Sequence, residues 1–171
     1  RLAALANFRL GKRIAALTVA QRAERELQRI SQLLGAMRYR ALASPAFIAR
    51  HFAQGVTPTA LARSPAIVFG PDDQLQHRYL QGLGVEGGFI HHLCPSSEGF
   101  VRMTEGGLGW GLVPEQQVQA QLASGSLCEL LPAQVLDVPL YWHHWRNGGE
   151  LLSELTRQLQ RSVGQWLVQP E

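Results

Sequence analysis

Short apolar runs alternate along the chain with stretches of helical periodicity. The runs are β-branched, or they alternate with polar residues as in a half-buried strand, so we expect strands at 13–19, 36–44, 65–70, 87–94, 108–114, 127–133 and 138–145. The periodic stretches carry helix start and stop signals, such as proline at a first helical position and glycine at an end. They predict helices at 1–10, 45–53, 57–64, 71–84, 96–107, 115–125 and 150–168.

This order of elements predicts an α/β fold. Strands that alternate with helices usually form a mainly parallel sheet with helices on both faces. In such sheets, ligands bind at the carboxyl ends of the strands, beside the amino ends of the following helices. We therefore look for the site in the turns that lead from a strand into a helix.

Composition narrows the class of protein. Of the 171 residues, 46% are hydrophobic and 17% are charged, which is typical of a folded chain with a real core. No apolar run approaches the roughly 20 residues needed to cross a bilayer, and the start does not resemble a signal peptide, so we expect a soluble, cytoplasmic protein without a membrane partner. The net charge is +3, but Arg22, Arg25 and Arg29 alternate with glutamates, as on a solvated face rather than a nucleic-acid surface.

The stretch "CPSSEGFVRMTEGGLGWGLVP", residues 94–114, is the richest in candidate chemistry. Its glycines follow a predicted helix and lead into a strand, which is the reverse of the order in a dinucleotide-binding loop. We interpret Gly106 and Gly107 as a helix end, and Gly109 and Gly111 as places of close backbone approach.

Catalytic and metal-binding patterns are weak. Cys94 and the serines after it lack the G-x-S-x-G pattern of a nucleophile turn. The pairs His91-His92 and His143-His144 lie on predicted strands, where neighbouring side chains point to opposite faces and cannot chelate one ion together. We expect no catalytic residues, no metal and no cofactor, and hence no enzyme.

Ser96, Ser97 and Glu98 lie where a strand ends and a helix begins. Free amides and hydroxyls at such a turn can bind a carboxylate. A simpler interpretation is that one serine caps the helix, while Glu98 is favoured by the helix dipole. Both can hold at once, because one hydroxyl can cap while neighbouring amides bind.

Four segments together resemble a known family: "LGAMRYRALASPAFIARHFAQGVT", "SPAIVFGPDDQLQHRYLQ", "SSEGFVRMTEGGLGWGLVPEQQVQAQLASGSL" and "LYWHHW". The set resembles the effector-binding region of LysR-type transcriptional regulators, and most closely the branch that responds to arginine and lysine and controls basic amino-acid export. The likeness runs from about Leu10 to Val163, and the connection at 20–33 matches least well.

The resemblance implies two Rossmann-like lobes of the periplasmic-binding-protein type. Lobe one would comprise residues 1–40 and 136–171 and would be incomplete at its start, and lobe two would comprise 41–135. The family's helix-turn-helix would precede this region, so DNA would be contacted only through that missing part. The full-length protein would be a homo-oligomer, a dimer or a tetramer.

The same resemblance places a small effector, lysine or arginine, in a cleft between the lobes. The expected contacts are Thr18, at the end of a lobe-one strand, Asp72 and Asp73, at the start of one helix, and Ser96, Ser97 and Glu98, at the start of another. Two alternatives remain: an exported solute-binding protein with the same lobes, and a small α/β enzyme.

Overall fold

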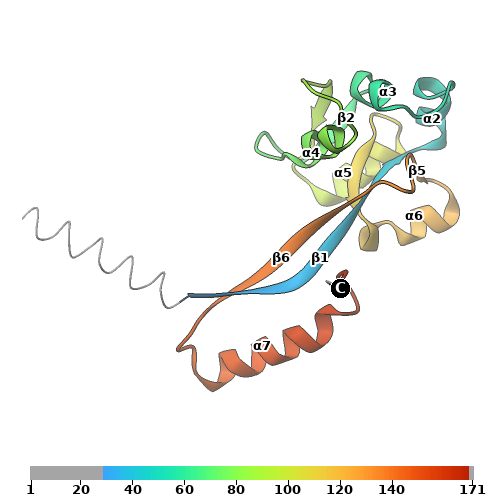
Figure 1. Ribbon diagram of the computed structural model, residues 1–171. Coiled ribbons are helices and arrows are strands. Elements are labelled where there is room, and N and C mark those ends of the chain that lie inside the picture. The colour runs from blue at the N-terminus through green and yellow to red at the C-terminus, as the bar shows by residue number, and fades with distance from the viewer. Residues whose placement is uncertain (1–28, 170–171) are drawn as a thin grey trace, which may run out of the picture. The chain divides into compact units, whose positions relative to one another are not determined.

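The structure is a computed structural model in which residues 29–169 are described (Figure 1). The helix expected at 1–10 and the strand expected at 13–19, with Thr18, lie outside the described residues. The described elements, in chain order, are β1 (Arg29–Ala43), α2 (Pro45–His51), α3 (Pro58–Arg63), β2 (Ala66–Val68), α4 (Leu75–Gly82), β3 (His91–Leu93), α5 (Ser97–Glu105), β4 (Gly111–Pro114), the 3₁₀ turn η1 (Glu115–Gln117), α6 (Gln119–Ser124), β5 (Cys128–Glu129), β6 (Val135–Trp145) and α7 (Gly149–Val163).

The described chain divides into two compact units, residues 36–138 and residues 29–35 with 139–169. The assignment of effector lobes at 1–40 with 136–171 and at 41–135 stays a prediction. No helix within residues 29–169 combines the length and the apolar character that a membrane crossing requires.

The sheet topology corrects the expectation of a mainly parallel sheet. In the four-stranded sheet, β1 pairs antiparallel with both β4 and β5, and β6 also pairs with β1. Parallel pairing joins β2 to β3, and a single parallel bridge joins Ala66 to Trp110. Alternating strands and helices predict the elements but not the direction of pairing, which depends on contacts between segments far apart in the sequence.

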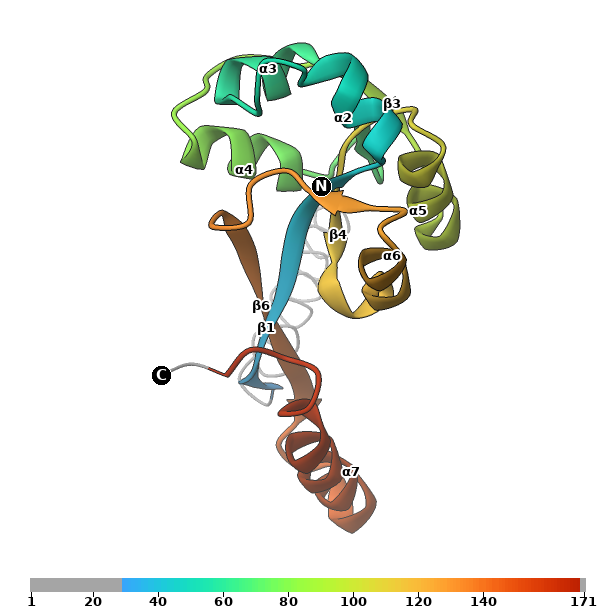
Figure 2. The same ribbon diagram turned by 90° about the vertical axis from the view of Figure 1, so that its right-hand side faces the viewer.

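Two packed layers cover the sheet of unit 36–138. Phe47, Leu61 and Tyr79, from α2, α3 and α4, pack in one cluster with Ala41 and Leu112. A second cluster brings α5 and the segment around α6 against the alternate strand residues, with Leu42, Ile67, Phe100, Val113, Val118 and Leu127 as members. Since successive strand residues point to opposite faces, the two clusters lie on the two faces of the sheet. Figure 2 shows α4 on one side of β1 and β4, and α5 and α6 on the other side.

Trp110 is the largest fully buried side chain in this unit, with 0% of its surface exposed. Its indole N–H donates to the carbonyl of Leu61 over 3.1 Å, so the one polar atom of the ring is satisfied. Its neighbours Gly109 and Gly111 confirm the expectation of close approach. A Cβ at Gly109 would lie 2.9 Å from Ile67 Cγ1, and a Cβ at Gly111 would overlap the ring of Phe100.

Two helix starts follow the sequence signals. Pro45 opens α2 behind the cap Ser44, and Pro58 opens α3 behind Thr57, whose hydroxyl accepts from the Ala60 N–H over 3.2 Å. Helix α5 also begins as expected, with the Ser96 hydroxyl accepting from the Gly99 N–H over 3.1 Å. The expectation that a serine caps this helix is therefore confirmed for Ser96.

Other boundaries differ from expectation. Helix α4 begins at Leu75 rather than at 71, so Asp72 and Asp73 lie in the turn before it and not in its first turn. The strand β1 begins at Arg29, within the stretch 20–33 that was expected to be a polar connection. Helix α7, expected at 150–168, ends at Val163. Within the described residues none of its side chains is buried, and Leu151 is 84% exposed.

Candidate functional site

A cavity of about 350 Å³ lies within unit 36–138, beyond the carboxyl ends of β2 and β3. Its apolar walls come from β1, the segment 69–75, α5 and β4. The apolar lining residues are Met37, Tyr39, Phe69, Leu75, Phe100, Leu112, Val113 and Pro114. Asp73, Ser97 and Gln117 add polar groups. A cavity of this size, mostly apolar with a few polar side chains, is typical of a site for a small molecule.

One wall of the cavity is built by β1 and β4. Met37 and Tyr39 share one face of β1 because they are two residues apart. Tyr39 lies directly opposite Pro114 in the antiparallel register, so both residues reach the cavity from adjacent strands. The sequence alternation at 36–44 had predicted this strand, but it did not show that this face borders a cavity.

Asp73 enters the cavity from the turn between β2 and α4. Its Oδ1 accepts from the Leu75 N–H over 2.9 Å, and its Oδ2 accepts from the Phe69 N–H over 3.2 Å. Both of those neighbours also line the cavity. The carboxylate therefore holds its own turn in shape, while it presents a negative charge to the cavity.

Burial and the negative charge of Asp73 both affect the pKa of Tyr39. Burial raises the pKa of the Tyr39 hydroxyl, and the negative charge of Asp73 raises this pKa further. The hydroxyl thus stays protonated at neutral pH. It offers a hydrogen-bond donor beside the only carboxylate among the cavity-lining residues of the described chain.

The amino end of α5 supplies a polar group that can bind an anion. Ser97 is the first residue of this helix and lines the cavity. The first N–H groups of an α-helix have no partner within the helix and carry a partial positive charge, so this end favours an anion.

The predicted site residues separate into two groups. Asp73 and Ser97 line the same cavity, which their separation in the sequence could not show. Asp72, Ser96 and Glu98 are not among the lining residues; Ser96 caps α5, and Glu98 pairs with Arg102 over 2.5 Å on the exposed helix surface. Sequence reasoning missed the lining residues Tyr39, Phe69, Phe100 and Gln117.

Metal and thiol chemistry gain no support from the geometry. No three histidine, cysteine or carboxylate side chains gather closely enough for a metal ion within residues 29–169. Cys94 is buried, with its Sγ 3.7 Å from the carbonyl oxygen of Ser96.

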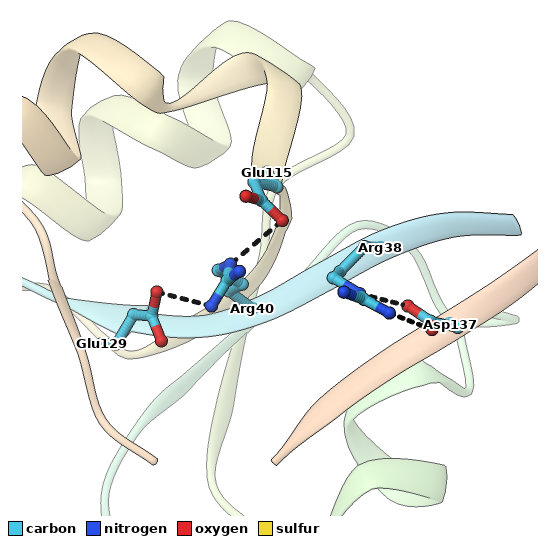
Figure 3. Close-up of polar contacts among 5 residues, drawn as sticks. All are labelled: Arg38, Arg40, Glu115, Glu129 and Asp137. Carbon is cyan, nitrogen blue, oxygen red and sulfur yellow. Dashed lines mark hydrogen bonds and ion pairs between the residues drawn. The ribbon is translucent and has the colours of Figure 1, made fainter. Parts of the chain in front are cut away.

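Two arginines of β1 form ion pairs beside the cavity wall (Figure 3). Arg38 binds Asp137 of β6 through two hydrogen bonds, of 2.8 Å from Nε and 2.7 Å from Nη2. Arg40 contacts two carboxylates: its Nη1 donates to Glu129 over 2.7 Å, and its Nε lies 3.1 Å from Glu115.

The Arg38–Asp137 pair predicts a defined pH dependence of stability. The hydrogen bonds from Arg38, and then its charge, hold the pKa of the Asp137 carboxyl below its usual value. A depressed pKa stabilises the fold above the unfolded value, near 4, and this contribution disappears as the pH falls through the folded value. Asp137→Asn should therefore cost stability at about pH 6 and progressively less at about pH 3, as measured by urea unfolding. An unchanged difference across this range would contradict the assignment.

Comparison with known proteins identifies the family. Residues 15–167 match the LysR substrate binding domain. The HTH-type transcriptional regulator ArgP of Pseudomonas aeruginosa is 75% identical over 138 residues, which cover 81% of this chain and 46% of that protein. The chain thus spans about half the length of the curated relatives that it matches.

Solved structures agree with this match. The C-terminal domains of a LysR family protein from Agrobacterium tumefaciens are 43% identical, with a TM-score of 0.77 over 84% of this chain and 70% of that chain. Full-length LysG of Corynebacterium glutamicum with bound effector Arg is 32% identical, with a TM-score of 0.68 over 84% of this chain and 48% of that one. These matches confirm the expected α/β fold of a LysR effector-binding domain, similar to periplasmic binding proteins, and the chain belongs to the LysR substrate-binding domain family.

Proposed function

We propose that the chain is the effector-sensing part of a LysR-type transcriptional regulator, and that its effector is arginine or lysine. The proposal rests on one observation: Asp73 and Ser97 line the same cavity, whose other walls are mostly apolar. The likeness to ArgP, and to a LysG structure with bound Arg, supports a basic amino acid over other small molecules.

The cavity suits both ends and the middle of such a ligand. The guanidinium or ammonium group would pair with the Asp73 carboxylate, and the Tyr39 hydroxyl would donate to a ligand oxygen or to Asp73 itself. The α-carboxylate would bind the amino end of α5 at Ser97. The methylene groups would pack on the apolar walls, which include Phe69 and Phe100. The predicted contact through Thr18 lies outside the described residues.

Regulation would follow from a difference in the affinity of the effector for two conformations of the sensing part. A ligand shifts an equilibrium between two conformations only as far as its affinity for the two differs. The names of the relatives refer to a helix-turn-helix, and we propose that such a domain binds DNA. In a homo-oligomer, the conformation of the sensing part would then control how this domain binds DNA. Control of basic amino-acid export genes is the target that this branch of the family suggests.

Isothermal titration calorimetry tests the proposal. L-arginine or L-lysine should bind with measurable heat and raise the melting temperature. L-citrulline, which has the shape of arginine without its charge, should bind more weakly, because it cannot form an ion pair with Asp73. If neither basic amino acid gives heat or a change in melting temperature, the proposed effector is wrong.

A further inference from the structure

We propose that Arg40 is a positioning residue for the effector cavity: through Glu115 it holds the segment Pro114–Gln117 against β1, opposite Tyr39. This inference rests on the proposed function, since the wall that it concerns borders the proposed effector site. Arg40 would thus influence the affinity for the effector without lining the cavity.

Arg40 itself does not line the cavity. It follows Tyr39 on β1 and therefore points to the opposite face of the sheet, as the alternation of a strand requires. In the register with β4, Tyr39 lies opposite Pro114 and Arg40 lies opposite Val113. Val113 lines the cavity as Pro114 does, so the ion pairs of Arg40 lie next to residues of β4 that border the ligand.

The backbone ladder between β1 and β4 ends just before Glu115. Tyr39 and Pro114 form its last pair, so no further pair of this ladder holds Glu115 to β1. Beyond it, η1 carries Gln117 to the cavity, and Val118 fixes the far end of this turn in the core, with 0% of its surface exposed. The Arg40–Glu115 ion pair attaches the near end of the turn to β1.

The guanidinium is held firmly enough to act in this way. The Arg40 side chain is 21% exposed, and its bond of 2.7 Å to Glu129 ties it to β5. Its Nε faces Glu115 at 3.1 Å without a well-directed N–H, so this second contact is an ion pair rather than an aligned hydrogen bond. The planar group can meet two carboxylates at once, which the single ammonium of lysine does less well.

Arg38 provides a matched control. It lies on the same face of the same strand and is bound in two places to a carboxylate. However, its partner Asp137 lies on β6, which contributes no residue to the described lining of the cavity. Loss of the Arg38 pair should therefore affect stability more than affinity.

The test compares affinity for L-arginine with thermal stability in four single variants. Arg40→Gln and Glu115→Gln should each weaken binding by about tenfold, whereas Arg38→Gln and Glu129→Gln should change it by less than about twofold. All four should lower the melting temperature, so that a general loss of stability does not explain the difference in affinity. In the double variant Arg40→Gln with Glu115→Gln, affinity should fall no further than in Arg40→Gln alone, because both changes break one contact.

The outcomes separate this inference from the proposed function. If the unaltered protein binds neither L-arginine nor L-lysine, the proposed function fails and this inference fails with it. If the unaltered protein binds L-arginine and Glu115→Gln binds it equally well, only the positioning role is wrong. Glu115→Gln decides the question even if Arg40→Gln does not fold, because Glu115 is 36% exposed and its loss leaves the Arg40–Glu129 pair in place.

Discussion

Asp73→Asn is expected to weaken the binding of L-arginine about 30-fold, or by about 2 kcal/mol. The change removes the negative charge that the cavity offers to the cationic end of the ligand. It leaves one side-chain oxygen to accept a hydrogen bond from the turn, where the aspartate has accepted from both Phe69 and Leu75. Calorimetry with L-arginine measures the effect.

A comparison with L-citrulline separates the charge from the shape of the turn. If Asp73 pairs with the guanidinium, Asp73→Asn should reduce the preference for arginine over citrulline, and not only the affinity for both. Asp72→Asn is the matched control, because Asp72 is the neighbouring carboxylate and does not line the cavity. Equal losses of arginine affinity in the two variants would contradict the assignment of Asp73.

The largest loss of stability is expected from Trp110→Ala, at about 3–5 kcal/mol of the free energy of unfolding. The substitution opens a cavity in a core where Trp110 packs beside Tyr79 with a ring separation of 6.2 Å. It also leaves the buried carbonyl of Leu61 without its indole donor. Urea unfolding, followed by near-ultraviolet circular dichroism, measures this loss.

Trp145→Ala serves as the control for the loss of a tryptophan, because Trp145 is 48% exposed. It should cost clearly less stability than Trp110→Ala, since about half of the Trp145 surface is already in contact with water. If Trp110→Ala lost as little free energy of unfolding as Trp145→Ala, the region around Trp110 would not be a packed core.

The sequence predicts the elements better than their connections. Ser44, Thr57 and Ser96 cap helices as their residue types and the prolines or glycines near them suggest. These signals are local, because a cap bonds to an amide three residues away. The antiparallel pairing of β1 with β4 and β5 depends on tertiary contacts, and no local pattern encodes it.

The candidate site was predictable only in part for the same reason. The rule that ligands bind beyond the carboxyl ends of parallel strands directs attention to Asp73 and Ser97, which follow β2 and β3. Tyr39 and Gln117 reach the cavity from segments that are distant in the sequence and carry no motif. The early start expected for α4 was wrong, because Asp73 accepts hydrogen bonds that hold a turn and delay the helix.

Chemical-shift mapping of the backbone amides during a titration with L-arginine tests the central claim most directly. We predict that the largest shifts occur at the amino end of α5, around Ser97, and in the turn from Phe69 to Leu75, where three residues line the cavity. Shifts confined to α7, or the absence of shifts in both of the cavity segments at saturating arginine, would contradict the account.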